Sequence, residues 1–278
     1  MTSAAGVYVL QILQHLPNFF ATRTSVKLDD APLTIGGQFL ASDKLHPTGT
    51  FSQEITFRDG KEVINPMLST HSGEIHPEAG LESQGEFGPE LVAVFLDVTN
   101  SKLAFHHWEQ TRYGPVAVYR YAVPISASHY QVNYVCAGRT AHQEVRAYHG
   151  SLSIDPKYGA IMRITLEVDS AVSDALSHVA SVIEYGPVLI GERISICPVR
   201  SLTFMAQESD FCTHPGRNKK LVRPVTMLNR TSFTDYHRLG SSSRIILDAN
   251  GALTTNPITH DMPDAQKPTA QTPNLQPE

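Results

Sequence analysis

The clearest alternation of apolar and polar side chains lies in residues 143–169. From Met162 to Val168 every second residue is apolar and each residue between is polar, which is typical of a strand with one buried and one solvated face. Residues 148–154 are the expected partner strand, and the loop between the two strands contains Asp155, Pro156 and Gly159. The stretch therefore predicts a β-hairpin whose buried face is formed by Met162, Ile164, Leu166 and Val168.

Further strand-like segments recur along most of the chain, about 8 to 12 residues apart and separated by turn residues. This spacing predicts a single antiparallel sheet in which successive segments pair, with the hairpin in its middle. The segments are residues 19–28, 51–57, 62–64, 102–110, 115–123, 129–136, 179–185, 188–190, 193–197, 200–207, 221–236 and 243–247.

Two segments are predicted to be helical. Apolar residues from Val9 to Leu16 recur at positions i, i+3, i+4 and i+7, and Pro17 ends this stripe. In residues 85–96, Pro89 suits a first helical turn and apolar residues follow at helical spacing, although LVAVFL is also compatible with a buried strand. The predicted fold class is α+β: one strongly curved antiparallel β-sheet, an open half-barrel, with an N-terminal helix and a second short helix on its concave side.

Composition narrows the function classes and the domain organisation. A chain of 278 residues with 41% hydrophobic and 18% charged side chains suits a globular protein with a core. Its net charge of −5 provides no basic face for nucleic acid. No apolar run reaches the roughly 18 residues of a membrane-spanning helix. Residues 1–249 are predicted to form one half-barrel domain, and the proline-rich residues 250–278 a disordered tail.

The N-terminal segment bears on localisation. Its first basic residue is Arg23, so it lacks the charged start of a signal peptide. We therefore expect it to be a short helix of the mature protein, while an additional upstream signal peptide and a cytoplasmic location both stay open as alternatives.

The cysteines do not indicate a metal site. Cys136, Cys197 and Cys212 form no CxxC pair and have no zinc-ligand spacing. Cys197 and Cys212 are the only pair close in sequence, so at most one disulfide is expected, and buried or incidental thiols are the favoured interpretation.

Catalytic motifs are absent, and the 13 histidines are scattered. The sequence contains no GxSxG elbow, no HExxH and no phosphate-binding glycine loop. His106 and His107 are neighbours on a predicted strand, so their side chains should point to opposite faces and could not share one ion. A metal-dependent hydrolase would require three histidines to converge from among His71, His76, His106, His107, His129, His142 and His149. The sequence thus predicts no catalytic residue, no metal site and no cofactor.

Five motifs in fixed order resemble a family of uncharacterised envelope proteins of Acidobacteria and related bacteria. They lie within residues 8–245 and match, in turn, an LPNF opening, a GEFG helix, an aromatic strand, a YxGxxxxDPxxGxxxRI hairpin and a DYGPVxIGG-like segment. The departures from the pattern are Glu192 in place of a second glycine and Cys197 in place of a leucine before Pro198. The motifs are LPNFFATRT (16–24), GEFGPELVAVF (85–95), VYRYAVP (118–124), AYHGSLSIDPKYGAIMRI (147–164) and IEYGPVLIGERISICPVR (183–200).

This family is similar to the LolA/LolB-type half-barrel of periplasmic lipoprotein carriers. The resemblance implies a non-enzymatic protein of the periplasm or cell envelope that buries a hydrophobic ligand, such as a lipid or acyl chain, and it supplies no catalytic residues. The residues predicted to line the ligand site are Phe57, Phe105, Tyr119, Tyr121, Tyr148, Leu152, Ile164 and Leu166.

Two other functions remain possible from the sequence. The first is a protein–protein interaction module whose sheet edge or tail docks onto an envelope protein, with the concave face filled by its own side chains. The second is the metal-dependent hydrolase that uses loop histidines. The concave face separates the carrier from the interaction module, because a void lined by apolar side chains favours a carrier and a filled concavity favours the module. Convergence of three of the histidines would favour the hydrolase.

Overall fold

The computed structural model describes residues 16–30, 33–35, 38–40, 44–59, 61–64, 70–72, 89–99, 101–135, 141–169, 176–207, 225–239, 246–247 and 253–254. The chain divides into two compact units, Met1–Leu239 and Gly240–Glu278. The helix predicted before Pro17 lies outside the described residues. In the second unit, β16 (Ile246–Leu247) pairs with β17 (Leu253–Thr254), while the predicted tail from residue 255 onward also lies outside the described residues.

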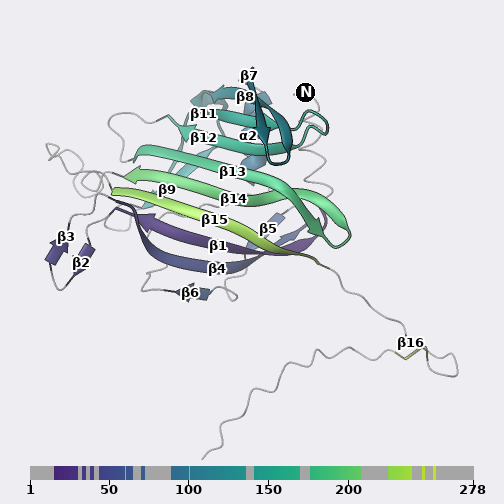
Figure 1. Ribbon diagram of the computed structural model, residues 1–278. Coiled ribbons are helices and arrows are strands. Elements are labelled where there is room, and N and C mark those ends of the chain that lie inside the picture. Colours follow the sequence, from purple (N-terminus) through teal and green to yellow (C-terminus); the bar gives the residue numbers. More distant parts are fainter. Residues whose placement is uncertain are drawn as a thin grey trace, which may run out of the picture. The chain divides into compact units, whose positions relative to one another are not determined.

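Eleven strands of the first unit form one antiparallel sheet that is not closed into a barrel (Figure 1). β7 forms one edge, and the other edge is formed by β5 and by β6 (Thr70–Ser72), which both pair with β4. The prediction of one large, open antiparallel sheet is confirmed at this level. The strand order is β5 (Lys61–Ile64), β4 (His46–Arg58), β1 (Phe19–Asp29), β15 (Val225–Arg238), β14 (Arg193–Gln207), β13 (Leu176–Ile190), β12 (Ile161–Val168), β11 (Tyr148–Ile154), β8 (Gly114–Val123) and β7 (Lys102–Thr111).

Two short hairpins and one 3-10 turn in the described part of the first unit lie outside this sheet. β2 (Leu33–Ile35) pairs with β3 (Gln38–Leu40), and a 3-10 turn, η2 (Ile125–Ala127), follows β8. β9 (Gln131–Val135) pairs with β10 (Ala141–Val145) in a separate hairpin. The prediction that residues 129–136 continue the main sheet is therefore wrong. Pro124 and η2 come between β8 and β9, and β8 pairs with β11 instead.

The predicted hairpin is present as β11 and β12, with one difference in register. Asp155 accepts backbone hydrogen bonds from Lys157 and Tyr158 in the turn, and Gly159 has a positive φ of 71° that suits glycine. A β-bulge pairs Ile154 with Ile161 and skips Met162. Ile161 consequently joins Ile164, Leu166 and Val168 in the main core, whereas Met162 packs in another cluster with Val116, Val118 and Ala160. The prediction that Met162 shares their face is wrong for this reason.

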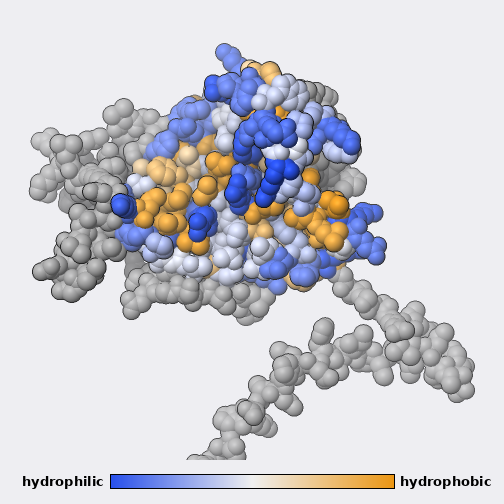
Figure 2. Space-filling model, in the orientation of Figure 1, coloured by the Kyte–Doolittle hydropathy of each residue, from blue (hydrophilic) through white to orange (hydrophobic). Residues whose placement is uncertain are grey.

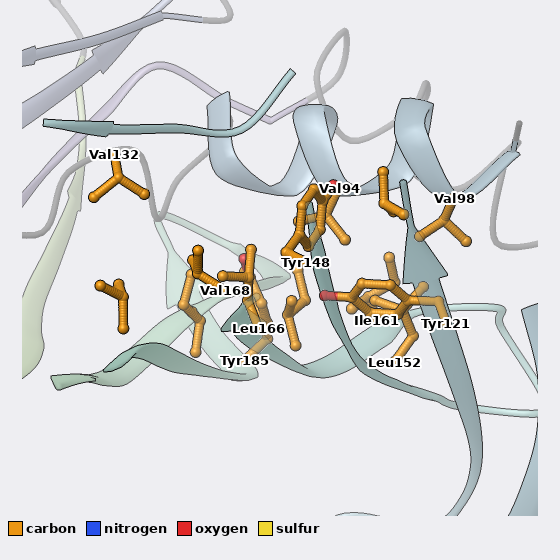
Figure 3. Packing of buried hydrophobic residues seen from close by; sticks show 14 of the residues in the cluster. Val94, Val98, Tyr121, Val132, Tyr148, Leu152, Ile161, Leu166, Val168 and Tyr185 are labelled. Carbon is orange, nitrogen blue, oxygen red and sulfur yellow. The ribbon is translucent and has the colours of Figure 1, made fainter. Parts of the chain in front are cut away.

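Helix α2 (Pro89–Thr99) packs on one face of the sheet. Pro89 occupies its first position, where no backbone hydrogen bond is lost. Val94 and Val98 point from the helix towards the sheet and are buried there against Tyr121 and Tyr148 (Figure 3). We call this side of the sheet the α2 face; it carries Tyr121, Leu152, Ile164 and Ile183, and all residues that pair with them across the strands.

The opposite side, the outer face, carries charged pairs. Arg163 donates to Glu109 at 2.9 Å, and Arg200 donates to Glu184 at 2.6 and 2.9 Å. Figure 2 shows blue and orange mixed over the visible surface of the molecule, with orange at the turn between β13 and β14. The exposed apolar residues next to that turn are Leu189 and Ile194, which pair with each other.

Candidate functional site

Strand register arranges most of the predicted ligand-lining residues in two neighbouring rows on the α2 face. The first row runs across β7, β8, β11 and β12, and the second lies two residues along the strands. Tyr148 lies one row beyond the second, opposite Val123 and Val168. The first row consists of Phe105, Tyr119, Leu152 and Ile164, and the second of Leu103, Tyr121, Gly150 and Leu166.

Phe57 is the exception among the predicted residues. It lies on β4, pairs with Phe19 and stacks on that ring at a centroid distance of 5.3 Å. Both rings belong to a second core cluster that also contains Ile55 and Phe233. Its strand alternates like the others, so the sequence pattern puts Phe57 in the same site, but in the strand order β4 is six strands away from β11.

Most of the predicted residues on the α2 face are core residues. Tyr148, Leu152, Ile164 and Leu166 are fully buried beneath α2 and its neighbours. Tyr121 lies over Gly150, where an added Cβ would come within 1.9 Å of the Thr165 carbonyl oxygen. The Tyr121 hydroxyl donates a hydrogen bond to this Thr165 carbonyl oxygen at 2.7 Å. These side chains therefore hold the helix and sheet together. The residues that could contact a ligand lie nearer the edge of the sheet.

Three aromatic residues continue the apolar surface to the edge of the sheet. A β-bulge at His106 interrupts the alternation of β7, so that Phe105 and Trp108 lie on the same face. The Phe105 ring is 5.9 Å from the Trp108 ring and 5.7 Å from the Tyr119 ring, centroid to centroid. Phe105 and Trp108 are 51% and 54% exposed. We call Phe105, Trp108 and Tyr119 the aromatic edge.

Trp108 was missed as a site residue in the sequence. Strict alternation along residues 102–110 puts Trp108 on the opposite face from Phe105, and nothing in the sequence marks a bulge except the pair of adjacent histidines. The same bulge overturns a second expectation. The rings of His106 and His107 do not point to opposite faces but lie 4.6 Å apart, with their Nδ1 atoms in contact.

The histidine pair does not gather further metal ligands. His107 Nε2 is 4.0 Å from Glu109, whose carboxylate is held by Arg163. Desolvation, followed by the charges of Arg120 and His107, lowers the pKa of His106. Within the described part of the chain, no group of three or more His, Cys, Asp or Glu side chains could hold a metal ion. His76 lies outside the described residues.

A buried carboxylate anchors α2 to the sheet. Asp97 is fully buried and accepts hydrogen bonds from the Tyr148 hydroxyl at 2.7 Å and from the backbone N–H of His129 at 2.8 Å. His129 Nδ1 lies 2.5 Å from the other carboxylate oxygen, although the imidazole itself is largely exposed. Burial, followed by the hydrogen bond to Asp97, raises the pKa of Tyr148. The polar groups in this part of the face are thus paired with one another.

Farther along the same face, the buried residues become polar. Leu166 pairs with Ser181, and the row continues through Thr203 and Asn229 to Lys27. We call Ser181, Thr203, Asn229 and Lys27 the polar row; all four are buried. In the next row, Ser25 and Thr231 share a buried hydrogen bond of 2.8 Å between their hydroxyls.

Two atoms of the polar row have no hydrogen-bond partner. The hydroxyl oxygen of Thr203 and the side-chain carbonyl oxygen of Asn229 are both buried and unpaired. These residues face each other across β14 and β15. The sequence contains no signal for Asn229, because polar residues occupy both faces of β15 around it.

Cys197 is a free thiol buried in the second core cluster, and burial raises its pKa to about 12. It is therefore a packing residue, not a nucleophile. Cys136 and Cys212 lie outside the described residues. No helix in the described ranges is long and apolar enough to cross a membrane.

Comparisons with known proteins add little to this geometry. No protein-family model matches the chain, and a search of curated proteins found no match. Among solved structures, the crystal structure of a LolA superfamily protein from Nitrosomonas europaea is similar with 10% sequence identity, covering 85% of this chain and 94% of that chain at a TM-score of 0.31. A similarity this low carries no argument about function, and it does not show the acidobacterial family, which remains a prediction from the motifs.

Proposed function

We propose that this protein binds a lipid or acyl chain on the α2 face, by burial and without covalent chemistry, as a carrier or binding protein of the cell envelope. The observation that supports the proposal is the aromatic edge. Apolar surface continues from the core under α2 to Phe105 and Trp108, and about half of each of these two side chains is exposed. Clustered exposed aromatics that border a core are typical of a binding site.

The affinity would come mainly from apolar area removed from water. Each Å2 of apolar surface buried by a ligand contributes about 25 cal/mol. Exposed rings on a strand lose little conformational freedom when a chain packs against them, since their position is already set by neighbouring rings. The ligand would therefore recognise Phe105 and Trp108 as a preformed surface.

The single tryptophan gives a direct test, because all tryptophan fluorescence comes from Trp108. Titration with a saturated fatty acid should shift its emission to shorter wavelength in a saturable way, and a brominated fatty acid should quench it. Native mass spectrometry of the protein as purified should reveal bound lipid in stoichiometric amount. A clean unliganded mass together with no change in Trp108 emission would overturn the proposal.

A pair of variants locates the site. Phe105→Ala should weaken fatty-acid binding about tenfold, which corresponds to about 1.4 kcal/mol of lost apolar contact. Leu189→Ala is the matched control, since Leu189 is also apolar and exposed but lies next to the β13–β14 turn. Equal weakening by both substitutions would point to non-specific adsorption.

A second candidate function rests on the position of β7 at a sheet edge, where most of its side chains are exposed. An extended segment of an envelope protein could add to this edge as a further strand. Amide hydrogen exchange separates the two functions. A partner strand would protect the β7 amides, whereas an acyl chain lying on the α2 face would leave their exchange unchanged.

A further inference from the structure

We propose that the polar row binds the negatively charged headgroup of the ligand, so that the protein selects anionic single-chain amphiphiles over neutral ones. This inference rests on the proposed function, because it concerns the headgroup of an acyl chain bound on the α2 face. The observation is a change of chemistry within one sheet face. Between Leu166 on β12 and Lys27 on β1, the buried residues turn from apolar to polar and cationic.

The polar row is a continuous feature of the sheet. Its four residues come from four adjacent strands, β13, β14, β15 and β1, and each faces the next in register. Neighbouring strands are about 4.8 Å apart, so the row places one polar side chain every few ångström along a straight path. Ser181 is directly opposite Leu166. In this row, the change from apolar to polar side chains therefore falls between β12 and β13.

Two atoms in the row point to a missing partner. Thr203 is 7% exposed and Asn229 is 2% exposed, yet the Thr203 Oγ1 and the Asn229 Oδ1 have no hydrogen-bond partner. Buried polar atoms in folded proteins are paired in the great majority of cases, because an unpaired one is costly. Both side chains can also donate, Thr203 through its hydroxyl and Asn229 through its amide nitrogen. The Thr203 hydroxyl could donate to an anionic headgroup, and the Asn229 amide could donate after a half-turn that exchanges its oxygen and nitrogen.

The charge on this part of the face favours an anion. Lys27 ends the row, and Arg23 lies two rows farther along β1 on the same face, opposite Gln53 and Phe233. Both cations are buried, and opposite charges attract more strongly in a buried site than in water. Asp29 also lies on this face, one row beyond Lys27, and is 3.4 Å from His46. A carboxylate or phosphate headgroup at the row would contact Lys27 and hydrogen-bond to Thr203 and Asn229.

The test compares two amphiphiles with the same chain, using isothermal titration calorimetry of the full-length protein at neutral pH. Dodecanoate has an anionic carboxylate headgroup, and monododecanoylglycerol has a neutral glycerol headgroup on the same chain. The protein should bind dodecanoate at least about tenfold more tightly. Acetate and inorganic phosphate, which lack the chain, should bind at least about a hundredfold more weakly than dodecanoate.

Three variants assign the preference to the polar row. Lys27→Met keeps the side-chain stem and should reduce the preference for dodecanoate to less than about threefold, by weakening dodecanoate binding more than binding of the neutral lipid. Thr203→Val should weaken only dodecanoate binding, by about threefold, and it serves as the test if Lys27→Met does not fold. Arg230→Met is the matched control, because it removes an equal charge from an exposed position on β15 whose neighbours Asn229 and Thr231 face the other way.

The outcomes distinguish the two proposals. Equal affinity of the unmodified protein for both amphiphiles would overturn the headgroup site and leave the proposed function standing. Binding of inorganic phosphate as tightly as dodecanoate would replace the headgroup site by a site for free anions. An undiminished preference in Lys27→Met and Thr203→Val would place the headgroup elsewhere. Failure of both amphiphiles to bind would overturn the proposed function itself.

Discussion

The α2 face contains two parts that are built in different ways. Under α2, on β8, β11 and β12, the buried side chains are apolar, and the few polar groups among them are paired: Asp97 with Tyr148 and His129, and the Tyr121 hydroxyl with a backbone carbonyl. In the middle of β14, β15 and β1, polar side chains occupy the buried positions of this face, and two of their atoms lack partners. The first part is complete as a protein core, and the second leaves two buried polar atoms without a hydrogen bond; we call them the complete and the incomplete part.

This difference separates stability from function. Side chains in the complete part hold the fold, so their removal should cost stability whatever the ligand. Unpaired groups in the incomplete part weaken the fold. Their removal should therefore lower the free energy of unfolding only slightly or even raise it, while ligand binding becomes weaker. The predictions below test that contrast by measuring the free energy of unfolding in urea, from the largest expected change to the smallest.

The Asp97 anchor should give the largest change. Asp97→Ala removes a buried carboxylate and leaves the Tyr148 hydroxyl and the His129 N–H without an acceptor. We expect a loss of about 4 kcal/mol, as for breaking a buried charged network. The matched control is Asp169→Ala, because Asp169 also pairs with a histidine, His149, but both groups are about half exposed. Its loss should stay below about 1 kcal/mol. Similar losses for the two variants would contradict an anchoring role for Asp97.

The second-largest loss of unfolding free energy is expected for a substitution in the core under α2. Leu166→Ala creates a cavity between fully buried neighbours and should cost about 3 kcal/mol. Leu202→Ala provides the control, since Leu202 lies on the outer side of β14 and is 40% exposed. Its loss should be under about 1 kcal/mol. If Leu166→Ala were as mild as Leu202→Ala, the part of the face under α2 would be loosely packed and would itself have room for a ligand.

Much of this architecture could be predicted from the sequence. The alternation from Ile164 to Val168 and the turn at Asp155 and Gly159 identified the central hairpin, because period-2 patterning and turn chemistry are local properties. The order of the strands was not predictable in the same way. Phe57 and Phe105 both occupy apolar positions of alternating strands in the sequence. Only the long-range pairing of β1 with β4 and β15 separates the two residues in space.

Two bulges account for the errors within strands. A bulge inserts one residue and reverses the faces beyond it, so a single insertion moved Met162 out of the main core and brought Trp108 to the same side as Phe105. The polar row escaped prediction for another reason. Asn229 and Thr231 alternate with Arg230 and Ser232, so both faces of β15 read as solvated, and only the register shows which one is buried.

The paired hydroxyls of the incomplete part should give the next effect. Thr231→Val removes the hydroxyl that bonds to Ser25 and leaves the Ser25 hydroxyl buried without that partner. The expected loss is about 1.5 kcal/mol. Adding Ser25→Ala to this variant should restore part of the stability, since the buried Ser25 hydroxyl that lost its partner is then removed as well. A double variant less stable than Thr231→Val alone would mean that Ser25 has a further role in packing.

Thr203→Val should have the smallest effect, and it should be of opposite sign. The Thr203 hydroxyl is buried without a partner, and valine has nearly the same shape, so the variant should gain about 1 kcal/mol. The gain should shrink by about 0.6 kcal/mol, the equivalent of the threefold difference in affinity, when unfolding is measured with saturating dodecanoate, because the hydroxyl then has a partner that only the unmodified protein can use. A loss of stability without ligand would show that Thr203 already completes the fold, and the two parts of the α2 face would no longer differ in kind.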